Sequence, residues 1–164
     1  MTQQVEMSTG IHDFDFLFGE WTIANSKLED PLADDAKWLE FGATVEVRPI
    51  LGGLGNIDLY SAPDFPGRPG YHGFGLRLLE PETGLWRIWW ASTTGRGQLD
   101  TPVVGRFRDG AGRFECDDLI DGRAVKVRFD WKDITPSSAR WEQSFSFDDG
   151  GAHETNWIME LTRR

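Results

Sequence analysis

The chain has 164 residues and a formal net charge of −10 at pH 7, a size that suits one domain with a substantial core. A chain this acidic is repelled by phosphate backbones and by anionic lipid surfaces, so we expect neither a nucleic acid nor a membrane as its partner. The single cysteine, Cys116, has no partner for an internal disulfide. The first residues show no signal-peptide pattern. A cytoplasmic location is therefore expected.

The elements expected along the chain are almost all β-strands. Glycine-rich turns alternate with β-branched and aromatic runs, which is typical of all-β folds. A short helix is expected at 12–18, after a flexible N-terminal arm over residues 1–11. Ten strands follow, at 20–28, 38–49, 54–60, 71–80, 85–93, 103–108, 113–119, 123–132, 139–147 and 154–162. Ten antiparallel strands in one domain most easily bury their apolar faces and remove their edges by closing into an up-and-down barrel.

The strand order also assigns each connection to one end of the barrel. Connections after odd-numbered strands share one end, and connections after even-numbered strands share the other. The three longest connections, at 29–37, 61–70 and 94–102, all fall at the first end, which we expect to be the open mouth. The helix at 12–18 precedes the first strand, so it is expected to plug the opposite end.

The turn Asp121-Gly122 indicates which side chains face the interior, because Asp-Gly favours two-residue hairpins. If Ile120 pairs with Arg123, then Asp118 shares the apolar inward face of its strand. A three-residue turn with a bulge would bring Asp117 inward instead. An interior carboxylate needs a donor, a cation, water or a ligand, or else it takes up a proton.

Several segments resemble the calycin pattern of lipocalins and fatty-acid-binding proteins. Gly19-Glu20-Trp21 opens the first strand and Arg163 lies near the end of the last. In the sequences of segments 14–21, 51–56 and 154–160, the chain also resembles an uncharacterised bacterial calycin-like family of unknown function. This resemblance extends over nearly the whole length of the chain. The resemblance implies one calycin-like β-barrel over residues 1–164, with Trp21 packed against Arg163 at the closed end. It implies no established activity, and the cysteine pairs of secreted lipocalins are absent.

No cofactor or metal ion is expected. The three histidines lack the paired spacing of metal ligands, which leaves His72 and His153 as the candidates for an axial haem ligand. The chain also lacks the Gly-rich opening strand and the proximal-His context of the haem-binding nitrobindins. The glycine runs at 51–55 and 73–75 have no helix after them, as a phosphate-binding loop would require, and are interpreted as turns or bulges.

The expected function is binding of a small, largely apolar or aromatic molecule in the barrel lumen. Ligand pockets are mostly apolar and aromatic, with a few polar groups that orient the ligand. Arg68, Arg96 and Arg123 lie in connections at the mouth, where they would favour amphipathic anions. A homodimer is a possible assembly. The candidate ligand-binding residues are His72, Trp90, Asp118, Arg123, Trp141, Gln143, Phe145 and Trp157.

An enzyme on the same barrel is the alternative. A cofactor-free isomerase, cyclase or hydratase would use Asp118 or His72 as its acid or base, while the tryptophans exclude water. A third interpretation is a barrel filled by its own side chains. The residues do not decide whether the chain is an enzyme. An Asp118→Asn substitution would change the affinity of a binding protein but remove the turnover of an enzyme.

Overall fold

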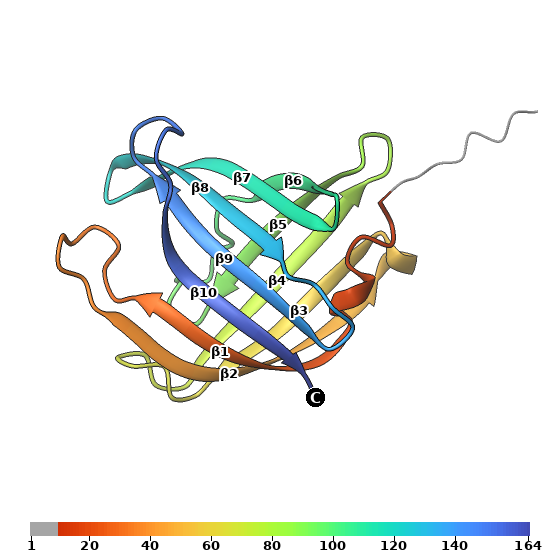
Figure 1. Ribbon diagram of the computed structural model, residues 1–164, viewed down its shortest axis with the longest axis horizontal. Coiled ribbons are helices and arrows are strands. Elements are labelled where there is room, and N and C mark those ends of the chain that lie inside the picture. The colour runs from red at the N-terminus through yellow and green to blue at the C-terminus, as the bar shows by residue number, and fades with distance from the viewer. Residues whose placement is uncertain (1–9) are drawn as a thin grey trace, which may run out of the picture.

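The computed structural model describes residues 10–164 as a closed antiparallel β-barrel (Figure 1). Each strand pairs with its neighbours in the chain, and β1 closes the barrel by pairing with β10. All ten predicted strands are confirmed, with small differences at their ends. The strands are β1 (Gly19–Leu28), β2 (Trp38–Ile50), β3 (Gly55–Ala62), β4 (Tyr71–Glu80), β5 (Leu85–Ser92), β6 (Val103–Arg108), β7 (Ala111–Ile120), β8 (Arg123–Lys132), β9 (Ser138–Ser146) and β10 (Glu154–Arg163).

The predicted helix at 12–18 is wrong. The segment forms only a 3-10 turn, η1 (Asp15–Leu17), and a second turn, η2 (Leu51–Gly53), follows β2. One turn gains few of the hydrogen bonds that make a helix cooperative, so its conformation depends on tertiary packing. The predicted N-terminal arm lies mainly over residues 1–9, outside the described residues, while Ile11 packs against the core.

The turn η1 nevertheless plugs the barrel, at the end opposite the long connections (Figure 1). Phe14 and Leu17 are almost fully buried. The ring of Phe14 meets those of Trp86 and Phe107 edge to face, at 4.9 and 5.0 Å between centroids. The plug is therefore apolar and aromatic, and it separates the interior from solvent at this end.

Trp21 and Arg163 pack together at the closed end, as predicted. They are directly paired between β1 and β10, and the guanidinium lies 4.2 Å from the indole centroid. The guanidinium also donates to the carbonyl oxygens of Phe16, Phe18 and Pro136, at 2.6, 2.7 and 3.0 Å. One side chain thus joins the plug, the first strand, the last strand and the β8–β9 connection.

The Asp121-Gly122 turn has the predicted two residues. Ile120 pairs with Arg123, and Asp118 pairs with Val125 across the hairpin. Both turn residues have positive φ, at 50° and 77°, as a tight hairpin of this kind requires.

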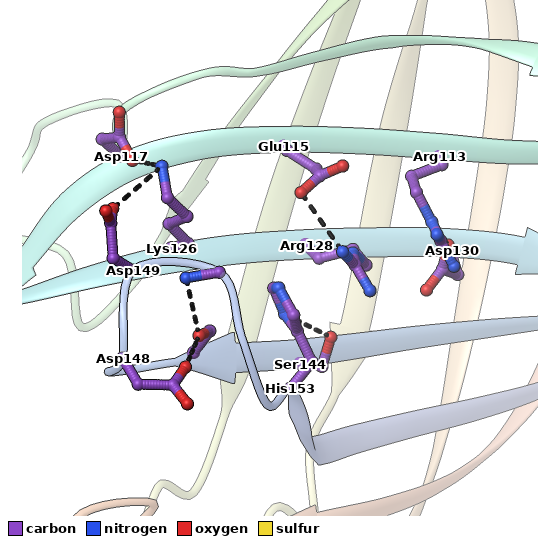
Figure 2. A network of polar contacts seen from close by, with 12 residues as sticks. Arg113, Glu115, Asp117, Lys126, Arg128, Asp130, Ser144, Asp148, Asp149 and His153 are labelled. Carbon is purple, nitrogen blue, oxygen red and sulfur yellow. Dashed lines mark hydrogen bonds and ion pairs between the residues drawn. The ribbon is translucent and has the colours of Figure 1, made fainter.

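The outer face of β7 and β8 carries a ladder of opposite charges (Figure 2). Lys126 bonds the Asp117 carboxylate at 2.7 Å, and Arg128 lies 3.4 Å from Glu115. Next to this ladder, the imidazole Nδ1 of His153 lies 3.5 Å from the Ser144 hydroxyl on the outside of the barrel. These charges neutralise one another away from the lumen, and His153 is not placed to ligate a group inside it.

Candidate functional site

A cavity of about 390 Å³ extends through the barrel from the mouth, where Thr94 and Gly95 line it, to Leu17 of the plug. Its walls are mainly aromatic and aliphatic. A polar ligand would therefore lose its hydrogen bonds to water there without forming new ones to the protein. The barrel is therefore not filled by its own side chains. The largest aromatic groups on the wall are Tyr71, Trp90, Phe129, Trp131, Trp141, Phe145 and Trp157.

Six of the eight predicted binding residues line this cavity. They come from four strands, because inward positions alternate along each strand and neighbouring strands keep them in register. These residues are Trp90, Asp118, Trp141, Gln143, Phe145 and Trp157.

The predicted placement of His72 in the lumen is wrong. His72 is exposed on the outer face of β4, between two buried inward residues, Tyr71 and Gly73. The inward set of this strand continues with Gly75 and Arg77. Two glycines and an arginine conceal the apolar alternation that would have shown the correct face. His72 therefore cannot act on a ligand in the cavity.

The predicted placement of Arg123 on the cavity wall is also wrong. Arg123 is exposed at the first residue of β8, and its guanidinium lies 4.2 Å from the centroid of Phe147. Stacking on this ring holds the side chain at the rim. The side chain is consequently not part of the cavity lining.

Asp118 lines the cavity near the mouth, together with Asp100 from the β5–β6 connection. One carboxylate oxygen of Asp118 accepts from the backbone N–H of Leu119 at 2.8 Å and from the Thr101 hydroxyl at 3.3 Å. Partial burial and, secondly, the negative charge of Asp118 raise the pKa of Asp100. This side of the mouth is acidic.

Lys27, which the sequence analysis missed, lines the same cavity from β1. It is only 9% exposed. Its ammonium donates to the carbonyl oxygen of Leu28 at 3.2 Å and lies 5.3 Å from the Trp157 ring centroid. Burial, together with the nearby positive charge of Arg68, lowers the pKa of Lys27 to about 8. Counting by twos from Trp21 along β1 would have found this residue.

The floor of the cavity holds a buried ion pair that the sequence analysis also missed. Arg77 on β4 donates both terminal nitrogens to the Asp58 carboxylate on β3, at 2.5 and 2.8 Å. It donates further to the Asn56 side-chain oxygen at 2.8 Å. The guanidinium lies 5.0 Å from the centroid of Phe14 and 6.0 Å from that of Trp131. The pair and Leu17 of the plug together line the closed end of the cavity.

A hydrogen-bonded node at Asn25 holds one wall of the cavity in place. Its side-chain oxygen accepts from the hydroxyl of Tyr60 at 2.9 Å and from the indole nitrogen of Trp157 at 3.0 Å. Its side-chain nitrogen donates to the carbonyl of Phe41 at 3.3 Å. Burial raises the pKa of Tyr60, so its hydroxyl keeps the proton that it donates. The indole of Trp157 is thus oriented before any ligand arrives.

Cys116 lines the cavity but is a poor nucleophile. Burial, and then the negative charge of Asp118, raise the pKa of its thiol to about 11, and the thiolate is the reactive form.

Within residues 10–164 we find no group of three or more His, Cys, Asp or Glu side chains that could hold a metal ion. In the same part of the chain, none of the helices has the length and apolarity needed to cross a bilayer.

Known structures share this architecture, although no protein-family model and no curated protein matches the chain. Rv2717c from M. tuberculosis is 13% identical, with a TM-score of 0.62 over 96% of this chain and 98% of that one. The S-type phycobiliprotein lyase CPES from Guillardia theta is 11% identical, with a TM-score of 0.62 over 100% and 98% of the two chains. A third structure, EF1p2_mFAP2b bound to DFHBI, is 12% identical with a TM-score of 0.49 over 96% and 100%. The first two establish a shared fold, which agrees with the calycin-like barrel expected from the sequence.

Proposed function

We propose that the protein binds a small, largely apolar or aromatic molecule in the lumen of the barrel. The observation that carries the proposal is the open, aromatic cavity of about 390 Å³, whose volume lies within the range of small-molecule sites. A barrel selected only for stability would fill this space, because each cavity forfeits packing energy.

The tryptophan walls support an aromatic body in particular. Trp141 packs edge to face against Trp157 at 5.8 Å and against Phe129 at 5.0 Å. Such rigid aromatic surfaces give large contact area with little loss of side-chain entropy on binding. The Asn25 bond to Trp157 further reduces that loss.

Binding of the neutral aromatic probe 2-naphthol, measured by calorimetry, tests this proposal. Ile120→Trp places a bulky ring at an inward residue that lines the cavity, so it should abolish binding. Leu119→Trp is the matched control, because Leu119 is the adjacent residue and is exposed on the outer face. Equal affinity of both variants and the wild type would contradict the proposed site.

An enzyme remains the second candidate, with Asp118 as its acid or base. The Asp118 carboxylate faces the cavity beside Asp100, while His72 is excluded by its outward position. The fold shared with a phycobiliprotein lyase is compatible with an activity but does not select one. The substitution Asp118→Asn, assayed for both affinity and turnover of a bound compound, separates binding from catalysis.

We further propose that a second copy of the chain covers the outer face of β3, β4 and β5. On this face Leu59 pairs with Phe74 and Leu76 pairs with Trp89, where an exposed antiparallel sheet normally carries polar residues. The charges beside this patch are already paired, Glu46 with Arg48 at 2.7 Å and Glu80 with Arg87 at 3.7 Å. Two identical patches can therefore meet despite the acidic net charge.

Sedimentation velocity tests this assembly. The wild type should be a dimer, and Leu59→Glu should make it monomeric. Leu119→Glu introduces the same charge at an exposed leucine of β7 and should leave the dimer intact. A monomeric wild type at micromolar concentration would overturn the assignment.

A further inference from the structure

Two like-charged pairs lie on different sides of the cavity mouth. Lys27 on β1 and Arg68 in the β3–β4 connection form a cationic side, and Asp100 and Asp118 form an acidic side. Around the barrel, β1 and β7 are separated by β8, β9 and β10 in one direction and by five strands in the other. Lys27 and Asp118 therefore lie on nearly opposite walls of the lumen, while Arg68 and Asp100 lie in connections on the arc between them.

None of these four side chains contacts an opposite charge among the described residues, although the more distant Asp30 carboxylate partly offsets the positive charge of Lys27. The ion pairs among the described residues include none of these four side chains. By contrast, the other charges that line the cavity, Asp58 and Arg77, pair with each other. The exposed ladder on β7 and β8 is paired as well.

This arrangement costs stability. Lys27 is nine-tenths buried and lies close enough to Arg68 for the two positive charges to repel each other, which contributes to the lowered pKa of Lys27. Asp118 acts on Asp100 in the corresponding way. Like charges placed together at the mouth of a cavity without a counter-ion in contact are typical of sites whose ligand supplies the missing groups.

We propose that the ligand is dipolar: an aromatic body with one carboxylate, held by Lys27 and Arg68, and with a hydroxyl or amine donor at its far end, held by Asp100 and Asp118. The inference rests on the proposed function. The ammonium and the guanidinium complement a carboxylate by charge-assisted hydrogen bonds. The acidic side accepts a donor and repels a second carboxylate, so it sets the direction in which the ligand enters.

Naphthalenes substituted at positions 2 and 6 test the proposal, because their groups lie at opposite ends of a rigid ring system. Calorimetry at pH 7 should give 6-hydroxy-2-naphthoate the highest affinity, followed by 2-naphthoate and then 2-naphthol. Each step is expected to be about tenfold, the usual effect of one charge-assisted hydrogen bond. Naphthalene-2,6-dicarboxylate should bind at least about tenfold more weakly than 2-naphthoate.

Substitutions assign each preference to its side of the mouth. Lys27→Met should remove the preference for 2-naphthoate over 2-naphthol, and Arg68→Gln should reduce it. Asp118→Asn should remove the discrimination against the dicarboxylate while retaining the preference for 2-naphthoate. Lys37→Met and Asp35→Asn are the matched controls, because they change the net charge equally at exposed positions in the β1–β2 connection.

The outcomes separate this inference from the proposed function. Equal affinities for 2-naphthol, 2-naphthoate and the dicarboxylate would overturn the dipolar ligand and leave the binding function standing. Binding of the dicarboxylate as tightly as 6-hydroxy-2-naphthoate would overturn the role of the acidic side. Failure of all four probes to bind would overturn the proposed function itself.

Discussion

The indole of Trp90 lies directly over Gly73, so closely that a β-carbon on Gly73 would be 2.2 Å from a ring carbon. Two residues further along β4, a β-carbon on Gly75 would lie 2.9 Å from the Asp58 carboxylate. The sequence analysis interpreted the glycine run at 73–75 as a turn or a bulge, and this interpretation is wrong. The run lies within the regularly paired strand β4. Because these two residues have no side chain, Gly73 leaves room for the indole of Trp90 on the cavity wall, and Gly75 leaves room for the carboxylate of Asp58.

The substitution Gly73→Ala should displace Trp90. Because the indole fills the space of the new methyl group, the change should lower the free energy of unfolding by about 1–3 kcal/mol and weaken 2-naphthol binding. Gly42→Ala is the matched strand control, since a β-carbon there meets no atom within 4 Å. Urea unfolding and calorimetry measure both effects. Unchanged stability of Gly73→Ala would show that Trp90 can move without cost.

Loss of Arg163 should loosen the closed end. Arg163→Met removes three hydrogen bonds to carbonyl oxygens and the stacking on Trp21, which should cost about 2–4 kcal/mol of unfolding free energy. Arg164→Met, at the exposed neighbouring residue, should change it by less than about 0.5 kcal/mol. Chemical denaturation of both variants makes the comparison. Similar losses in the two would contradict this role of the guanidinium.

Lys27 should give the folding stability a pH dependence above neutrality. Its folded pKa of about 8 lies below its ordinary value of 10.5, so between these values the unfolded chain binds more protons and stability rises with pH. The free energy of unfolding of Lys27→Met should exceed that of the wild type by about 1–3 kcal/mol at pH 7. This difference should shrink as the pH rises from 8 to 10.5. Urea midpoints across this range measure it. A difference that is independent of pH would show that the ammonium is not desolvated.

The ion pair on the cavity floor should behave as a unit. Asp58→Leu leaves the Arg77 guanidinium buried without its carboxylate partner. The substitution should therefore lower the free energy of unfolding by about 3–5 kcal/mol. Adding Arg77→Met removes the uncompensated charge, so the double variant should be more stable than Asp58→Leu alone. A double-mutant cycle in urea gives the coupling free energy. Additive effects would mean that the two residues act independently.

The barrel could be predicted from sequence because its signals are local. Strands follow from period-two alternation between Asp-Gly turns, and the pairing of Ile120 with Arg123 follows from the geometry of a two-residue hairpin. Strand parity then placed Trp21 and Arg163 at one end, where they do pack together. These inferences need only the chain order and the alternation of side chains.

The binding site could be predicted where the inward face of a strand is apolar. Trp141, Gln143 and Phe145 on β9 and Trp157 on β10 follow the alternation and line the cavity. On β4 the inward face is marked by glycines and Arg77, so alternation misplaced His72. The helix at 12–18 was wrong for a different reason. Phe14 and Leu17 pack against the barrel, and the segment's hydrogen bonds, such as the one from the Leu17 N–H to the Phe14 carbonyl at 2.9 Å, make a single 3-10 turn.

Sequence by itself therefore determined the strands, the turns and the ends of the barrel, since each depends on residues that are neighbours or that alternate along one strand. Only the tertiary structure decided which charges meet. Arg77 on β4 pairs with Asp58 on the neighbouring strand β3, while Lys27 and Arg68 come together from separate parts of the chain. These contacts between charged groups depend on the closure and register of the barrel. They decide the chemistry of the cavity, because the electrostatic energy of a buried charge depends strongly on its nearest charged neighbour.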